Sequence, residues 1–290
     1  MAPSTRRSRA FASLQTKTAA LLTLSLVPLG ALSILQSVGE RQNAEDAAFS
    51  SLSAQTAKAA APEREAISEA LASARAMAAA LPEIGTDTEA CGTLARRIVE
   101  AQQSYSYVGF TDLSLTSTCN NFGDTFDFSF DEDAQGLLDN PRSDVSYVSQ
   151  GAASGEAVVV ATEPARDASG MLVGLVSVSF PAATLAAGGD ETPVKIVTFN
   201  HLGETLTSDM PTEELQKLLP QGTALADLAV LAGRSDTGFI AESVSGDAHK
   251  YSVVAIVPER AYALGIWLHK QQPRSYAFIV PVLMWLVTLA

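Results

Sequence analysis

Hydrophobic and polar positions divide this 290-residue chain into two apolar runs and a mostly polar region between them. The first run, residues 18–39, carries no charged side chain and would span roughly 33 Å as a helix, which is one bilayer crossing. The second run, residues 275–290, is apolar up to the last residue of the sequence. We therefore expect two transmembrane helices, the second one truncated, with residues 40–274 outside the membrane.

The charges that flank the first run indicate its orientation. The leader, residues 1–17, contains four basic residues and no acidic residue, whereas mixed charges follow from Glu40 onwards. The positive-inside rule then places the N-terminus in the cytoplasm. A cleaved signal peptide is the alternative, but its apolar region is typically about 7 to 15 residues long. Residues 36–42 also offer no clear small-x-small cleavage site, so that retention of the run is favoured.

Helical periodicity and then strand periodicity follow the first run. Apolar residues recur at steps of three and four over 40–87, with Pro62 as a point of kinking or restart, and again over 88–103. We predict a stalk helix and a second helix there. Beyond them, β-rich segments predict strands, and residues 120–140 look irregular. The predicted strands are residues 105–112, 117–119, 144–149, 157–163 and 171–180.

A similar pattern recurs on a smaller scale after residues 188–193, which read as a linker. We predict a helix that starts with Asp209 as its cap and Pro211 in its first turn, and another over 261–272 that leads into the second apolar run. The predicted strands are residues 194–200, 205–208, 237–244 and 250–258.

Cys91 and Cys119 are the only cysteines, and both fall in the region assigned to the oxidising side. We expect a disulfide that closes a loop of about 28 residues and contributes on the order of 3 to 4 kcal/mol. Two buried free thiols are the alternative. A metal site is disfavoured, because two cysteines without nearby histidines lack the ligands that zinc needs.

Composition narrows the choice of partners. The chain has 19 basic and 32 acidic residues, a formal charge of −13, and part of the basic set lies in the leader. This balance argues against nucleic acid, because phosphate binding needs clustered Lys and Arg. The acidic run Asp127, Asp131, Glu132 and Asp133 lacks the glycine and terminal glutamate of an EF-hand, so a solvated loop is favoured over a calcium site.

Several short motifs, in this order and spacing, carry a family resemblance. They are Cys91, the segment 105–112 (YSYVGFTD), Cys119, the segment 164–170 (PARDASG) and Gly174. The chain resembles the double-Cache, PAS-like extracytoplasmic sensor region of membrane-bound sensor histidine kinases common in alphaproteobacteria, well over residues 15–185 and only topologically over 194–265. One departure is that the family's Asp-Arg-Pro-aromatic-Phe motif is matched here only by Asp131.

The resemblance implies an α+β fold of tandem PAS-like Cache modules, antiparallel sheets with a long N-terminal stalk helix, between two membrane helices. The implied domains are residues 1–17, 18–39, 40–87, 88–187, 188–193, 194–265 and 266–290: leader, first span, stalk helix, membrane-distal module, linker, membrane-proximal module, and membrane-proximal helix with second span. The chain would sit in the bacterial inner membrane, with residues 40–274 in the periplasm.

The resemblance also places a small ligand, of unknown identity, between the first sheet and residues 120–148. The residues we predict to bind it are Tyr105, Tyr107, Asp131, Arg142, Tyr147 and Thr162. Arg142 is the only basic residue between Arg97 and Arg166, which makes it the natural anchor for an anionic group. The alternative is a surface arginine paired with Asp139 or Asp144.

No catalytic motif is visible, since the chain has no Gly-rich phosphate loop and no His-Glu-x-x-His or Gly-x-Ser-x-Gly sequence. His201, His249 and His269 are scattered and are taken as ordinary solvated or interfacial residues. We expect the input region of a two-component sensor histidine kinase, a homodimer that acts on a response regulator. ATP and Mg²⁺ would serve only its missing kinase domain. The alternatives are the input region of a chemoreceptor or diguanylate cyclase, or a membrane-anchored binding module without output.

Overall fold

A computed structural model of the chain describes residues 36, 40, 43–84, 87–184, 194–232 and 237–268. The leader, both predicted spans apart from Gln36, and the predicted linker lie outside these residues. In the described part, no helix is both long enough and apolar enough to cross a membrane. The chain separates into two compact units, residues 1–50 and 51–290. Residues 43–50 of the first unit are helical.

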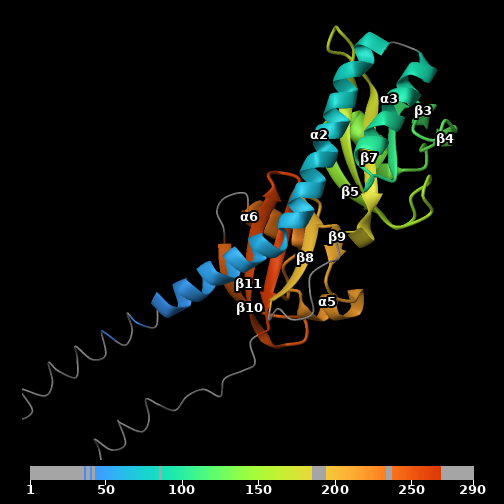
Figure 1. The fold of residues 1–290 in the computed structure, drawn as a ribbon. Coiled ribbons are helices and arrows are strands. Elements are labelled where there is room, and N and C mark those ends of the chain that lie inside the picture. The colour runs from blue at the N-terminus through green and yellow to red at the C-terminus, as the bar shows by residue number, and fades with distance from the viewer. Residues whose placement is uncertain are drawn as a thin grey trace, which may run out of the picture. The chain divides into compact units, whose positions relative to one another are not determined.

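Two five-stranded antiparallel sheets form the second unit, which confirms the α+β prediction with two sheets (Figure 1). The first sheet has the order β3-β1-β7-β6-β5, and a two-stranded ribbon pairs β2 with β4. Its strands are β1 (Tyr107–Asp112), β3 (Cys119–Asn120), β5 (Asp144–Val148), β6 (Val158–Arg166) and β7 (Leu172–Pro181), with the ribbon strands β2 (Thr116–Ser117) and β4 (Phe126–Asp127). The accompanying helices are α2 (Ala61–Ile84), α3 (Thr88–Ala101), α4 (Glu132–Asp139) and the 3₁₀ turn η1 (Ala182–Thr184).

The second sheet has the order β10-β11-β12-β8-β9. Its strands are β8 (Val194–Asn200), β9 (Thr205–Ser208), β10 (Thr237–Glu242), β11 (Ala248–Val257) and β12 (Ala261–Trp267), and its helices are α5 (Thr212–Leu218) and α6 (Leu225–Ala232). One face of this sheet packs against α5 and α6, where Phe199, Leu228, Tyr251 and Leu264 form an apolar core. The other face is covered by helical residues of 51–60 and by α2.

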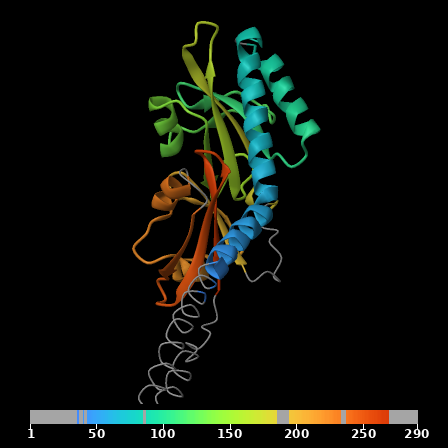
Figure 2. The same ribbon diagram turned by 90° about the vertical axis from the view of Figure 1, so that its left-hand side faces the viewer.

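Helix α2 lies along both sheets, and a single apolar core surrounds its buried face (Figures 1 and 2). Ile67, Ala70, Leu71 and Ala74 recur at steps of three and four and are buried. Because alanine side chains are short, this face of the helix approaches the strands closely. α3 packs beside α2, and the expected disulfide from Cys91 on α3 to Cys119 on β3 is present, with Cα atoms 5.6 Å apart.

Three predictions about the elements were wrong. Residues 261–267 are the strand β12 rather than a helix: β12 lies between β11 and β8 and is buried on both faces, so its sequence shows no alternation. Gly265 allows close packing on this strand, because a Cβ at that position would collide with the side chain of Thr56. The irregular segment contains α4, and α6 was missed altogether.

The start of α5 also differs from the prediction. Its N-cap is Pro211 without a side-chain hydrogen bond, not Asp209. The backbone N–H of Asp209 instead donates to the carbonyl of Ile196, which ties the end of β9 to β8. Asp209 therefore belongs to the edge of the sheet.

Glu63, in the first turn of α2, is a buried carboxyl group at the contact between this helix and the second sheet. Its side chain is 8% exposed. The hydroxyl of Thr207 on β9 donates to its Oε1 at 2.8 Å, and Oε2 has no partner among the described residues. Burial raises the pKa of Glu63 from 4.5 to about 7, the Thr207 hydrogen bond opposes this, and the charge of Asp209 adds to it.

We predict that this carboxyl group makes the chain less stable as the pH rises. A pKa that folding raises favours the folded state below the unfolded value, and that contribution is lost as the pH passes the folded value, here from about 4.5 to about 7. The free energy of unfolding should fall by up to about 3 kcal/mol between about pH 5 and about pH 8. Chemical denaturation across this range measures it.

Glu63→Gln keeps an acceptor for Thr207 and removes the charge, so it should flatten much of this slope. Glu65→Gln, at an exposed position of the same turn, should leave the slope as in the parent chain. Parallel pH profiles for Glu63→Gln and the parent would show that the prediction is wrong.

Candidate functional site

The two faces of the first sheet have different surroundings, because side chains alternate along each strand. Val159 and Ala161 on β6, and Val176 and Val178 on β7, point into the core shared with α2. Their neighbours in sequence point to the opposite face. There they line a cavity of about 300 Å³, near the lower end of the range for small-molecule sites.

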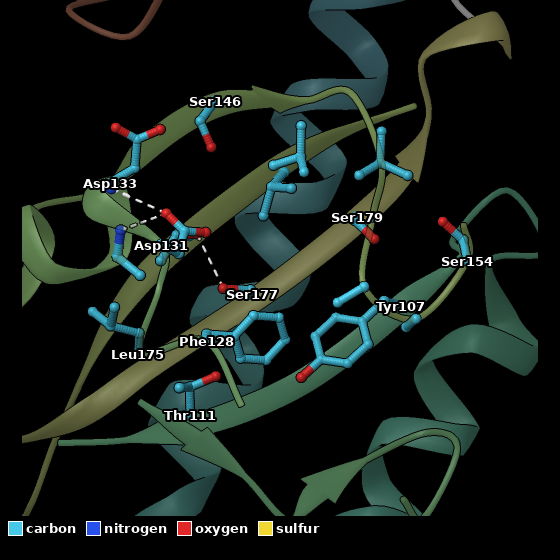
Figure 3. Close-up of a pocket in the computed structure, with 18 of the residues that line it drawn as sticks. Tyr107, Thr111, Phe128, Asp131, Asp133, Ser146, Ser154, Leu175, Ser177 and Ser179 are labelled. Carbon is cyan, nitrogen blue, oxygen red and sulfur yellow. Dashed lines mark hydrogen bonds between the residues drawn. The ribbon is translucent and has the colours of Figure 1, made fainter. Parts of the chain in front are cut away.

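Hydroxyl groups and small apolar side chains make the floor of this cavity (Figure 3). The register pairs Thr162 on β6 with Ser177 on β7, and their hydroxyl oxygens lie 3.1 Å apart. Ser179 lies two residues further along β7, and its hydroxyl oxygen lies 3.0 Å from that of Ser106. The residues of the floor are Thr111 on β1, Ser146 and Val148 on β5, Val158, Val160 and Thr162 on β6, and Leu175, Ser177 and Ser179 on β7.

Two segments outside the sheet cover the floor. One runs from β4 into α4 and contributes Phe128, Phe130 and Leu137, and the other is the loop 150–155 between β5 and β6. Asp131 fixes the first segment, because its Oδ1 accepts hydrogen bonds from the N–H groups of Asp133 and Ala134 at 3.0 and 3.1 Å and so caps α4. The cavity thus lies between a rigid sheet and two short connecting segments.

Tyr107 is the aromatic anchor at one end of the cavity. Its ring packs edge-on against Phe126 and Phe128, with centroids 6.0 and 6.1 Å away, and its hydroxyl bonds that of Ser117 at 2.9 Å. Burial raises the pKa of Tyr107 to about 12, although its side-chain hydrogen bonds oppose this. The hydroxyl is therefore neutral at physiological pH, and in the structure it is hydrogen-bonded to Ser117.

The charged groups around the cavity all have one sign. Among the described residues that line it, Asp131 and Asp133 are charged and none is Lys, Arg or His. Desolvation raises the pKa of Asp133, and the charges of Asp131 and Glu132 raise it further. The cavity is therefore negative at the end where α4 begins.

The structure places three of the six predicted ligand-binding residues, Tyr107, Asp131 and Thr162, on the wall of the cavity. Their role in binding stays a prediction. Tyr105 and Tyr147 are not part of that wall. Tyr105 is buried on the core side, where its hydroxyl lies 3.1 Å from that of Ser73 on α2, and Tyr147 alternates to the face away from Ser146 and is 38% exposed.

Arg142 is also not part of the cavity wall. Its Nη2 lies 3.2 Å from Nε2 of His201, in the turn between β8 and β9, and its Nε lies 4.0 Å from Asp144 Oδ1. His201 Nδ1 in turn lies 3.4 Å from the same carboxylate oxygen. Beside this cluster, the side-chain N–H of Asn200 donates to the carbonyl of Val145 at 3.0 Å. Arg142 thus takes part in a contact between the two sheets, which neither reading of the sequence included; of the two partners that the alternative named, it lies near Asp144.

Sequence reasoning missed the floor residues of β7 and the aromatic cover. The alternation in residues 172–180 (LVGLVSVSF) was visible and sets Ser177 and Ser179 on one face. Which face was free depended on where α2 packs, and the strand pattern alone does not contain that. Phe128 and Phe130 carry no local signal, because their position follows from the helix α4 that was not predicted.

A second hollow of about 680 Å³ lies near the disulfide, and residues of α2, α3 and the first sheet line it. The three aspartates on its wall, Asp87, Asp112 and Asp167, accept hydrogen bonds from nearby backbone N–H groups in caps and turns. The cavity of the first sheet is the stronger candidate site, because it combines a floor of hydroxyl groups with several aromatic side chains. Among the described residues, no group of three His, Cys, Asp or Glu side chains has the arrangement of a metal site.

Comparison with solved structures supports the fold. The extracellular domain of the putative histidine kinase rpHK1S-Z16 superposes with a TM-score of 0.59 at 12% identity, over 80% of this chain and 99% of that domain. The ligand-binding domain of the amino acid chemoreceptor PctC of Pseudomonas aeruginosa PAO1, in complex with GABA, gives 0.53 at 17% identity, over 77% and 99%.

An extracellular ligand-binding receptor from Desulfohalobium retbaense gives a TM-score of 0.53 at 18% identity, over 75% of this chain and 39% of that receptor. No protein-family model and no curated sequence matches the chain. At these identities the likeness shows the fold alone. It is the fold of extracellular and periplasmic sensor domains of histidine kinases and chemoreceptors, as the double-Cache resemblance implied.

Gly109 on β1 offers a test of how the cavity is held open. A Cβ at this position would collide with the hydroxyl of Tyr107 and lie 2.9 Å from the Cβ of Asn120. We predict that Gly109→Ala displaces the Tyr107 ring and destabilises the chain by about 1 to 3 kcal/mol. Gly136→Ala is the control, since nothing lies within 4 Å of a Cβ there and alanine suits a helix. Thermal melting compares them, and equal melting temperatures would contradict the prediction.

Proposed function

We propose that this chain is the extracytoplasmic input region of a two-component sensor histidine kinase, and that the cavity of the first sheet binds its small-molecule signal. The observation that carries the proposal is the cavity itself, a covered space of about 300 Å³ with a floor of hydroxyl groups and an aromatic wall. A lining of apolar and aromatic side chains with a few polar groups is typical of ligand sites.

The likeness in fold supports this role. Two of the structurally similar domains were solved with small ligands: the chemoreceptor PctC with GABA, and the chemoreceptor Tlp3 of Campylobacter jejuni with L-valine, the latter at a TM-score of 0.52 and 11% identity. We infer that a small metabolite binds here as well. The identity of that metabolite does not transfer at such low sequence identity.

The position of α2 supplies a route for the signal. Thr162 lies on the floor, and the next residue, Glu163, points to the core face, where its carboxylate binds Arg75 of α2 at 2.6 Å and Ser143 at 2.7 Å. A ligand that draws the floor and cover together therefore acts on a strand that α2 contacts directly. Such a shift requires different affinities for two arrangements of the helix.

A cavity-filling substitution tests the proposed binding. Val160 lies on the floor, and we expect Val160→Phe to extend into the empty space and raise the dissociation constant of the bound metabolite about 100-fold or more. Val230→Phe, at a 60% exposed position of α6, is the matched control and should bind as the parent does. Calorimetry of the 290-residue chain against a metabolite panel provides the measurement, with circular dichroism to check the fold. If Val160→Phe binds the metabolite as tightly as the parent chain does, the metabolite does not bind in this cavity and the proposal is wrong.

The parent protein is testable at the level of the gene. We expect the reading frame to continue past Ala290 into a dimerisation helix with a phosphorylatable histidine and an ATP-binding domain. A chemoreceptor signalling domain or a diguanylate cyclase domain would keep the sensor role and replace the kinase. A stop codon directly after Ala290 would instead favour an anchored binding module.

A further inference from the structure

The charge around the first-sheet cavity constrains the ligand, given the proposed sensing role on which this inference rests. Asp131 and Asp133 lie on the wall, and no Lys, Arg or His does among the residues that the structure describes there. A carboxylate or phosphate placed in this cavity would lose water without gaining a partner of opposite charge, and it would face two like charges. The wall is therefore matched to a positive group and mismatched to a negative one.

The position of Arg142 strengthens this argument. It is the only basic residue between Arg97 and Arg166, and it is the side chain best suited in this region to hold a ligand carboxylate. Its guanidinium lies instead against His201 and Asp144, in the contact with the second sheet. The arginine that an acidic ligand would need is thus committed elsewhere.

The carboxylate of Asp131 is also held in place before any ligand arrives. Its Oδ1 accepts the two cap hydrogen bonds of α4, from the N–H groups of Asp133 and Ala134. Two hydrogen bonds do not use all the acceptor sites of a carboxylate. Asp131 therefore retains capacity for an N–H donor of a ligand without giving up its structural role.

The aromatic side chains beside these carboxylates favour the same kind of ligand. Phe128 and Phe130 follow each other at alternate positions directly before Asp131, and both lie on the cavity wall with Tyr107. Phe130 is 73% exposed, so that much of its ring is accessible to a ligand. The face of an aromatic ring attracts an ammonium group, and the floor hydroxyls accept its hydrogen bonds.

We propose that the ligand of the first-sheet cavity is a small organic amine, bound as its ammonium cation, that carries no carboxylate. Asp131 supplies the opposite charge, and the rings of Phe128, Phe130 and Tyr107 contact the ammonium group and its carbon chain. L-Valine and GABA, the ligands in the two chemoreceptor complexes, each carry both an ammonium and a carboxylate group. We infer that the cavity of this chain excludes ligands with a carboxylate group.

Matched triads of ligands test the inference by calorimetry on the 290-residue chain. Each triad compares an amino acid with the amine that lacks its carboxylate and with the acid that lacks its ammonium group. The triads, in the order amine, amino acid and acid, are isobutylamine, L-valine and 3-methylbutanoate; propylamine, GABA and butanoate; 2-phenylethylamine, L-phenylalanine and 3-phenylpropanoate. We expect at least one amine to bind with a dissociation constant about tenfold or more below that of its amino acid, and no acid to bind. An amino acid or acid that binds as tightly as its amine overturns the inference.

Asp131→Asn supplies the second arm. Asparagine caps helices as well as aspartate, so the substitution keeps α4 and removes only the charge. We expect it to weaken amine binding about tenfold or more, whereas Asp139→Asn, an equal charge change at the exposed last residue of α4, should alter it less than about twofold. Unchanged binding in Asp131→Asn overturns the inference.

The two proposals fail in different ways. If no amine binds, but a neutral or anionic metabolite from the wider panel binds and is lost in Val160→Phe, the amine inference falls while the sensing role stands. If no compound of either panel binds the parent chain, both proposals fall.

Discussion

The packing of α2 against both sheets is the interaction on which the rest of the structure depends. Its buried face, with Ile67, Ala70, Leu71 and Ala74, belongs to one apolar core that includes Val159 and Val178 of the first sheet and residues such as Leu206 and Ala263 of the second. Each sheet has one face that needs an apolar partner, and a single helix supplies it to both. Because this core is continuous, the helix does not move relative to one sheet without disturbing its packing on the other.

The location of the candidate site follows from that commitment. Once α2 and α3 occupy one face of the first sheet, its other face is left to short segments: the ribbon with α4, and the loop 150–155. Short segments do not fill the space above five strands, and the remaining volume is the cavity. Arg142, the only arginine between Arg97 and Arg166, does not line the cavity. It lies at the contact between the two sheets, next to Asp144 and His201.

The sequence predicted those parts of the fold in which local pattern and final environment agree. The strands around residues 144–180 alternate cleanly, and their boundaries were predicted to within a few residues. The same reasoning failed for β12, because a central strand that is buried on both faces has the uniform apolar character of a buried helix. α4 was too short to show periodicity, although Asp131 followed by Glu132 and Asp133 carries the signature of a capped helix start. Of the residues predicted from the sequence to bind the ligand, Tyr107, Asp131 and Thr162 lie on the cavity wall. The exclusion of Arg142 rests on a contact with a histidine 59 positions away, which no local pattern reveals.

The alternation of β6 and β7 has a consequence for how such a chain diverges in evolution. On β6, even-numbered positions such as 160 and 162 form the floor, and odd-numbered positions such as 159 and 161 form the core with α2; on β7 the parity is reversed. A change of ligand preference therefore needs replacements at one parity only, and selection for stability acts mainly on the other. Neighbouring positions of one strand are therefore under different selection, which is one physical reason why this architecture persists among proteins that share as little as 11% of their residues with this chain.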